Sequence, residues 1–278
     1  MEQLSGNGSV SAKSLENKMI NILTDLKENH YVIGVKAEFE AEGASFEEVK
    51  MLKDMISHVG LDLTVKIGGC EAVTDITEAK KLDADTITAP MIETPYAMKK
   101  FVNTIYSIFS QAEAEKTKFL INIETITGYN NFSDIIGSDD FKILNGVVLG
   151  RGDMAGSVGL TREDVNTEQI LNIAQSMSEK IESTDKYFYV GGGVSAKSLP
   201  FFKKLPCLTG FQTRKIIFGS EALSRSDADK GILKAMVFEL LWLKNKYELS
   251  LATERDEARI SMLSKYNDLI ESVGGILV

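Results

Sequence analysis

Two carboxylates stand where an enzyme of the parallel-barrel type places ligands for a metal ion. Glu124 ends an apolar run over residues 119–124, and Asp153 follows a second apolar run over residues 147–149 and two intervening glycines. Short apolar blocks are typical of buried parallel strands, and residues just past the carboxyl ends of such strands face the ligand. Carboxylate oxygens from two strand ends suit Mg²⁺ or Mn²⁺. Glu124 and Asp153 are therefore the predicted metal ligands.

A purely structural explanation of the same two residues remains open. A carboxylate at a strand end can cap the turn that follows it, and an aspartate in a glycine-rich turn can form an Asx turn. The metal hypothesis is favoured because both residues follow the same kind of strand and turn.

The elements that would position these carboxylates alternate along the chain as strand and helix. Apolar strand patterns alternate with helix-like segments, which favours a parallel sheet. The predicted strands are residues 31–37, 61–69, 86–91, 119–124, 147–149, 186–193 and 208–219. A TIM barrel needs eight strands, and residues 3–5, ahead of a helix predicted over residues 11–29, are the candidate for the eighth. The predicted fold is α/β: a TIM (β/α)8-like barrel with an extended C-terminal helical segment.

The C-terminal segment is longer than a last barrel helix requires. We predict a barrel domain over residues 1–225 and a helical extension over residues 226–278, packed on the barrel or on a neighbouring subunit. The apolar residues Met236, Leu240, Trp242 and Leu243 recur at helical spacing, and we expect them to bury against a second copy. A homo-oligomer is the predicted assembly.

Composition limits the remaining function classes. The 278 residues carry 40 acidic and 31 basic side chains, a net charge of −9, which argues against nucleic acid or an anionic membrane as a partner. Cys70 and Cys207 lie far apart without metal-ligand spacing, which argues against a disulfide framework or a zinc site. Neither a signal peptide nor a long apolar stretch is apparent, so the expected compartment is the cytoplasm.

Three segments together carry a family resemblance: residues 85–102, 118–132 and 144–160. The middle segment has an Ile-Glu-Thr-like triplet at Glu124, and the last reads GRGDMAGSVG, with Asp153 and Ser157 among the matching positions. In this order the segments resemble the HpcH/HpaI aldolase and citrate lyase superfamily over roughly residues 30–160. The resemblance implies that Glu124 and Asp153 hold a divalent metal on which a 2-oxo acid or its enolate chelates. It also implies oligomers that exchange C-terminal helices.

Two departures from the family pattern concern the catalytic groups. Lys66 stands where the resemblance implies an arginine, and it keeps the positive charge but not the planar fork. The histidine of the aldolases is missing from the AEFEAEG segment, where Glu38 or Glu40 would serve as the base only if burial raised its pKa. His30 and His58 are predicted to be solvated residues at helix C-termini.

Other residues are candidates for holding an acidic substrate. Arg151 lies in the GRGDM turn and is predicted to meet a substrate carboxylate or phosphate, with a surface turn residue as the alternative. Gly150 and Gly152 of the same turn are predicted to contact the substrate. Arg214 is placed in the last strand with its side chain pointing inward. The glycines at 191–193 form either an anion cradle or a plain turn.

Taken together, the sequence predicts an enzyme of the lyase class that uses Mg²⁺ or Mn²⁺. It would cleave or form a carbon–carbon bond in a small 2-oxo acid or related acidic metabolite through a metal-stabilised enolate, with Lys66, Arg151 and Glu38 as catalytic residues. A citrate-lyase-like acyl-CoA ester lyase is one alternative. A barrel that binds a metabolite without turning it over is the other.

Overall fold

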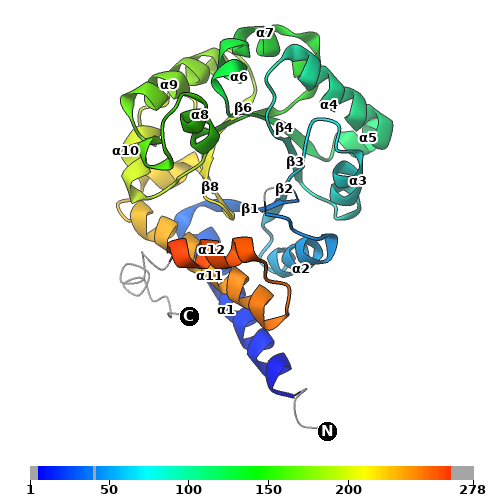
Figure 1. Cartoon of the computed structure of the whole chain (residues 1–278), viewed down its shortest axis with the longest axis vertical. Helices are drawn as coiled ribbons and strands as arrows, with labels where there is room; N and C mark the ends of the chain where they lie inside the picture. Colours follow the sequence, from blue (N-terminus) through cyan, green and yellow to red (C-terminus); the bar gives the residue numbers. More distant parts are fainter. Residues whose placement is uncertain (1–5, 40–41, 264–278) are drawn as a thin grey trace.

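Eight strands close into a barrel in the computed structural model, which describes residues 6–39 and 42–263 (Figure 1). Neighbouring strands pair in chain order from β1 to β8, and β8 pairs with β1 to complete the ring. The strands are β1 Val32–Glu38, β2 Asp62–Lys66, β3 Thr86–Ala89, β4 Lys118–Ile123, β5 Gly146–Gly150, β6 Tyr187–Gly191, β7 Gly210–Gln212 and β8 Ile216–Gly219. The (β/α)8-like barrel is confirmed.

The strands that close the barrel differ from the predicted strands at one place. Residues 208–219, predicted as one strand, form the hairpin of β7 and β8, so β8 runs antiparallel to both of its neighbours. The chain turns at residues 213–215, where the Thr213 hydroxyl accepts a hydrogen bond from the backbone N–H of Ile216 at 3.0 Å. The strand proposed at residues 3–5 lies outside the described residues, and the hairpin supplies the eighth strand instead.

Helices surround the barrel (Figure 1). The α-helices are α1 Gly6–His30, α2 Phe46–Ser57, α3 Val73–Lys81, α4 Pro95–Ile108, α5 Gln111–Ala114, α6 Ile126–Asn130, α7 Phe132–Gly137, α8 Arg151–Ser157, α9 Glu168–Glu182, α10 Leu199–Phe202, α11 Ala228–Glu248 and α12 Glu254–Leu263. Short 3₁₀ turns are η1 Asp139–Ile143, η2 Arg162–Asp164, η3 Ala196–Ser198 and η4 Ser220–Ser224. Within the described part of the chain, no helix combines the length and apolar character needed to cross a membrane.

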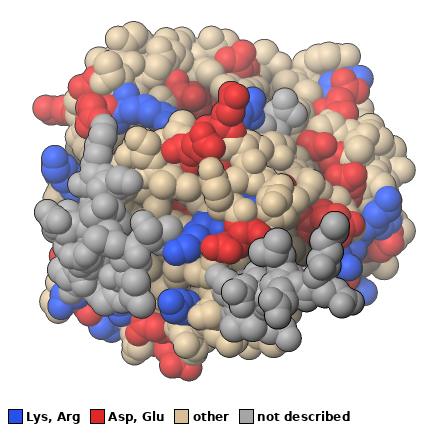
Figure 2. Space-filling view, turned by 60° about the horizontal axis from the view of Figure 1, so that its bottom comes forward, with Lys and Arg blue, Asp and Glu red and all other residues tan. Residues whose placement is uncertain are grey.

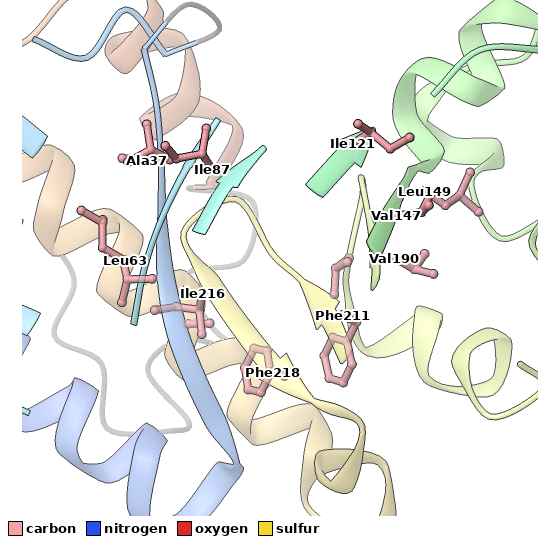
Figure 3. Packing of buried hydrophobic residues seen from close by; sticks show 14 of the residues in the cluster. Ala37, Leu63, Ile87, Ile121, Val147, Leu149, Val190, Phe211, Ile216 and Phe218 are labelled. Atoms are coloured by element: carbon pink, nitrogen blue, oxygen red, sulfur yellow. The ribbon is translucent and has the colours of Figure 1, made fainter. Parts of the chain in front are cut away.

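Strand alternation sends apolar side chains outward to the helices and polar ones inward. The outward set is fully or almost fully buried, and Figure 3 shows ten of its members: Ala37, Leu63, Ile87, Ile121, Val147, Leu149, Val190, Phe211, Ile216 and Phe218. On this outer side the Phe211 ring stacks on Phe202 of α10 with the ring centroids 4.8 Å apart. The inward residues line the space enclosed by the strands, here called the lumen. Many of them are polar or charged, whereas bulky branched side chains dominate the usual TIM-barrel interior.

The C-terminal helices pack on the barrel of the same chain. Helix α11 lies along α1 (Figure 1). The residues predicted to need a second subunit are already covered within the chain, since Met236, Leu240, Trp242 and Leu243 are all buried. These residues therefore need no second copy to be buried, because α1 and neighbouring elements of the same chain pack around α11; their contact with another subunit stays a prediction. Self-association of the protein stays a prediction.

Charged side chains of both signs lie close together on the side of the molecule that carries α11 and α12 (Figure 2). Several of these charges pair between elements. Lys246 of α11, for example, lies 2.8 Å from both Glu48 of α2 and Asp256 of α12. These ion pairs fasten the two C-terminal helices to α2.

Candidate active site

Glu124 lies at the carboxyl end of β4, at the carboxyl-terminal mouth of the barrel, with its side chain only 2% exposed. Three donors hold its carboxylate. The backbone N–H of Met91 donates to Oε1 at 3.0 Å, the Asn122 amide donates to Oε2 at 3.0 Å, and Lys66 Nζ lies 3.3 Å from Oε2. Met91 has a φ of 52°, a left-handed conformation that a non-glycine residue rarely adopts. The bond to Glu124 helps to hold this strained turn beside the site.

Asp153 is brought next to Glu124 by the turn that follows β5. A Cβ added to Gly150 would lie 2.5 Å from Glu124 Oε2, so only glycine lets the end of β5 approach this carboxylate. Asp153 follows in the first turn of α8. At the other end of α8, the Ser157 hydroxyl accepts a hydrogen bond from the backbone N–H of Ile126 at 2.8 Å, which ties α8 to the turn after β4. The two carboxylates therefore project from neighbouring turns that are fastened together.

The electrostatics of this pair fit a divalent cation. Burial raises the pKa of Asp153, and the charge of Glu124 raises it further. A bound cation between the two side chains would remove the repulsion that the Glu124 charge exerts on the Asp153 carboxylate. Within residues 6–39 and 42–263, no group of three or more acidic, histidine or cysteine side chains is assembled for a metal. Glu124 and Asp153 would thus hold the ion together with water or substrate oxygens.

Three further charged side chains, Lys36, Glu38 and Lys66, lie in the lumen next to Glu124. Lys36 Nζ lies 2.7 Å from Glu38 Oε1, and Lys66, next to Glu38 in the β1–β2 register, reaches across to Glu124. Burial would lower the pKa of Lys36, but the carboxylates of Glu38, Glu42 and Glu124 outweigh this and raise it. The site therefore alternates in sign along Lys36, Glu38, Lys66 and Glu124. The sequence reasoning missed Lys36, although its spacing of two from Glu38 signals the same strand face.

Glu38 lacks the raised pKa that a general base would need. Burial alone would raise its pKa, but the charges of Lys36 and Lys66 and the hydrogen bond from Lys36 outweigh burial and hold the pKa at about 2. A carboxylate with so low a pKa is a poor proton acceptor at neutral pH. The hypothesis that burial makes Glu38 a base is therefore not supported by its surroundings. Glu40, the other candidate, lies outside the described residues.

Arg151 is buried in the wall of the barrel, not exposed to a substrate. Its side chain is wholly buried, and all five of its N–H groups are within hydrogen-bonding distance of protein acceptors: the carbonyls of Val165, Gly191 and Gly192, the Asn166 amide and the Ser198 hydroxyl. The guanidinium also lies 4.8 Å from the ring centroids of Phe201 and Phe202. Burial lowers its pKa to about 9. The predicted substrate contact is replaced by a clamp between the β5–α8 and β6–η3 turns.

Arg214 also differs from its predicted position. It lies in the β7–β8 turn, because residues 208–219 reverse direction there, and not inside a strand. Its Nε lies 3.0 Å from Glu42 and 3.8 Å from Glu239 of α11. Its neighbour Lys215 is buried and forms an ion pair with Glu42. Arg214 still contributes to lowering the pKa of Glu38, so it belongs to the rim of the site.

The remaining candidates have structural roles. His58 is the C-cap of α2, as predicted, but His30 at the end of α1 is 3% exposed and packs against Gly231 of α11, so it is not solvated. Neither histidine is at the barrel mouth. The glycines at 191–193 form a turn. Gly192 has a φ of 79° and packs against the backbone of Gly152, since a Cβ on Gly192 would lie only 2.4 Å from the backbone nitrogen of Gly152. Substrate contacts of Gly150 and Gly152 stay predictions.

Two Glu-Thr dipeptides, at residues 93–94 and 124–125, follow β3 and β4, and the threonine of each caps a helix. Thr94 accepts a hydrogen bond from the backbone N–H of Ala97, and Thr125 accepts one from that of Gly128, as N-cap residues do. Thr125 also donates to Glu93 at 2.6 Å, which joins the β3 and β4 turns. The helix turns after β3 and β4 are therefore capped by Thr94 and Thr125. Glu124, for which the sequence left a capping role open, instead has its side chain turned into the lumen.

Comparisons with known proteins agree with this fold and identify a family. The model of the HpcH/HpaI aldolase/citrate lyase family matches residues 49–189. An HpcH/HpaI aldolase/citrate lyase family protein from Burkholderia cenocepacia J2315 has a similar structure, with 13% identity, coverage of 79% of this chain and 90% of that one, and a TM-score of 0.58. The structure of an HpcH/HpaI aldolase from Desulfitobacterium hafniense DCB-2 is also similar, with 10% identity and a TM-score of 0.56. The match covers 77% of this chain and 86% of that one. No curated protein sequence matches significantly.

Since the family model spans about half of the chain and includes Glu124 and Asp153, the chain belongs to the HpcH/HpaI aldolase/citrate lyase family. The low identities of the similar structures support the barrel fold alone. Family membership makes the protein an enzyme of the carbon–carbon lyase class.

The clamp formed by Arg151 leads to a stability prediction. A lysine places one ammonium where five N–H groups were directed, so the substitution Arg151→Lys leaves buried acceptors unsatisfied. We expect the free energy of unfolding, measured by urea denaturation, to fall by about 3 kcal/mol or more. The exposed Arg162→Lys is the control, with a change within about 0.5 kcal/mol. A loss below about 1 kcal/mol in Arg151→Lys would contradict the clamp.

The low pKa of Glu38 leads to a pH prediction. Its folded-state pKa of about 2 lies below its ordinary value of 4.5, so the stability it contributes is present above pH 4.5 and is lost as the pH falls toward 2. The full contribution is about 3 kcal/mol. Between about pH 6 and about pH 3, Glu38→Gln should therefore lose less unfolding free energy than the parent. The exposed Glu163→Gln is the control and should follow the parent. If plots of unfolding free energy against pH were parallel for Glu38→Gln and the parent, the lysines would not be holding Glu38 ionised.

Proposed function

We propose that the protein is a divalent-metal-dependent carbon–carbon lyase or aldolase that acts on a small 2-oxo acid or a related acidic metabolite. The observation that carries the proposal is the pair of Glu124 and Asp153, held on fastened turns, with the pKa of Asp153 raised by burial and by Glu124. Mg²⁺ or Mn²⁺ suits these hard oxygen donors. When bound, such an ion supplies Lewis acidity toward the carboxylate and keto oxygens of a 2-oxo acid.

The side chains of the protein supply charge and position. Lys66, directed at Glu124 from β2, offers a cation to the oxygen on which negative charge develops in an enolate. Lys36 and Glu38 next to it fix the local charge balance, and Lys36 in turn keeps Glu38 ionised. These groups support enolate formation on an acidic substrate.

The proposal favours enolate chemistry over aldol cleavage of hydroxy-oxo-diacids. Cleavage also needs a base at the more distant hydroxyl, and Glu38 with its low pKa is unsuited to that role. The similar structure of citrate synthase SbnG, at 14% identity with coverage of 70% of this chain and 81% of that one and a TM-score of 0.54, is compatible with this. Its name describes carbon–carbon bond formation by an enzyme of the same fold.

The metal site is tested by removing one charge at a time. Glu124→Gln and Asp153→Asn should each weaken Mn²⁺ binding by at least about 100-fold in calorimetry, because a neutral amide replaces a charged ligand. Circular dichroism should remain that of the folded parent. Asp139→Asn, at a carboxylate whose side chain is 94% exposed, should bind Mn²⁺ as the parent does. Unchanged Mn²⁺ affinity in both ligand variants would refute the site.

The reaction is tested with pyruvate in D₂O. We expect exchange of the methyl protons, followed by NMR, that requires added Mg²⁺ or Mn²⁺, together with decarboxylation of oxaloacetate. Lys66→Met should slow exchange by about 100-fold, since a charged donor to the oxyanion is lost, and Lys66→Arg should retain more activity than Lys66→Met. Lys99→Met, at an exposed lysine, is the matched control.

Two results would argue against this reaction. One is the absence of exchange while calorimetry shows Mn²⁺ bound, which favours a barrel that binds its metabolite without turning it over. The other is a Lys66→Met variant that matches the parent in rate and in apparent affinity for pyruvate.

A further inference from the structure

The amino-terminal end of the lumen, opposite the Glu124 site, contains a polar pocket. It has a volume of about 390 Å³ with its open mouth included, and its walls come from strands on all sides of the barrel. Thr64 of β2, Thr86 of β3, Tyr189 of β6 and Gln212 of β7 are among the lining residues. The interior of a TIM barrel is usually filled by branched apolar side chains, so a pocket with this lining is unexpected.

Three of the polar residues that line this pocket have no side-chain hydrogen-bond partner within the described part of the protein. Thr64, Thr86 and Gln212 are at most 6% exposed, yet in the described part of the chain none of their side chains makes a hydrogen bond with another residue. Deeper in the lumen, Thr88 Oγ1 and Asn122 Oδ1 are buried and also unpartnered. Buried polar groups are nearly always satisfied, because an unpaired one costs about 1–3 kcal/mol. Thr64, Thr86 and Gln212 line the open pocket, so their hydroxyl and amide groups are available to hydrogen-bond a molecule that enters it.

The chemistry of the lining selects a neutral molecule with several hydroxyl groups. Threonine hydroxyls and the Gln212 amide can both donate and accept, as can a phenol, and burial raises the pKa of Tyr189 to about 12, so its proton stays on. At the mouth Lys118 and Asp62 lie 3.5 Å apart, and their opposite charges favour neither an anion nor a cation. An apolar ligand would leave the polar atoms unsatisfied.

Aromatic and aliphatic groups form the other part of the wall. The rings of Tyr187 and Tyr189 lie with their centroids 6.2 Å apart, and Leu120 and Ile217 line the same pocket. Gly210 is required mainly by the strand next to it, since a Cβ there would lie 2.2 Å from the Phe218 carbonyl oxygen, and it also leaves room for the Tyr189 ring, 3.0 Å from the same position. A wall with both ring faces and hydroxyl groups matches a molecule that has C–H faces and hydroxyl edges.

From these observations we propose that the amino-terminal end of the lumen is a second small-molecule site, which binds a small neutral polyol or monosaccharide. The site is independent of the Glu124 site in its residues and in the mouth through which it opens. Its ligand would be held by Thr64, Thr86, Tyr189 and Gln212.

Saturation-transfer NMR on the full-length protein tests the site with three probes: glycerol, D-ribose and myo-inositol. We expect transfer to at least one probe. Its affinity should fall about tenfold in each of Thr64→Val and Gln212→Leu, since each isosteric change removes about one hydrogen bond to the ligand. Glu124→Gln should bind the same probe as the parent does, which separates this site from the proposed metal site. The charged analogue gluconate should bind more weakly than the neutral probes.

The two variants also carry a control for folding. Both replace an unpartnered buried polar group by an apolar one of similar shape, so the midpoint of thermal unfolding without a probe should stay level or rise. If no probe shows saturation transfer to the parent, or if transfer is unchanged in both variants, the proposal is wrong. A crystal structure grown with the probes that shows only ordered waters in the lumen would also overturn it.

Discussion

Closure of the barrel is the constraint on which the rest of the structure depends. Seven strands run parallel, and the ring is completed by β8, which pairs antiparallel with both β7 and β1. A hairpin needs only a few residues for its turn, whereas a parallel crossover needs a dozen or more. The turn therefore places Arg214 and Lys215 at the carboxyl-terminal mouth, and the chain leaves β8 at the opposite end. Glu42 and Glu239 of α11 then pair with these two cations and stabilise the rim next to the candidate active site.

The second consequence of closure is that every inward residue faces the same lumen. Alternation along β1 and β4 directs Lys36, Glu38, Asn122 and Glu124 into it. Each charge there would be costly alone, because burial removes its hydration, but each lies beside a charge of opposite sign. Removing one partner leaves the next one unpaired. This explains why the pKa values of Lys36 and Glu38 move in opposite directions although both side chains are largely shielded from solvent, at 15% and 13% exposed.

The sequence predicted the barrel and the carboxylate pair because both depend on local patterns. Apolar runs that end in Glu124 or lead to Asp153 are recognisable without knowledge of the packing. The β7–β8 hairpin was missed because the turn at residues 213–215 contains no glycine, proline or asparagine to mark it. Arg151 was misjudged because its acceptors come from residues 165–198, which only the folded chain brings near. Burial of Trp242 depends in the same way on α11 packing back onto its own barrel.

Lysine at position 66 is better understood from its neighbours than from the family pattern. It lies between Glu38 in register on β1 and Glu124 across the lumen, so its single ammonium serves two carboxylates from different directions. A planar guanidinium is best suited to two oxygens of one carboxylate, whereas an ammonium donates in three directions. The exchange of arginine for lysine, the loss of histidine and the presence of Glu38 with Lys36 therefore belong together. Under the function that we propose, such a site would stabilise negative charge on an oxygen, and neither His30 nor His58 lies where it could take a proton from a distant hydroxyl.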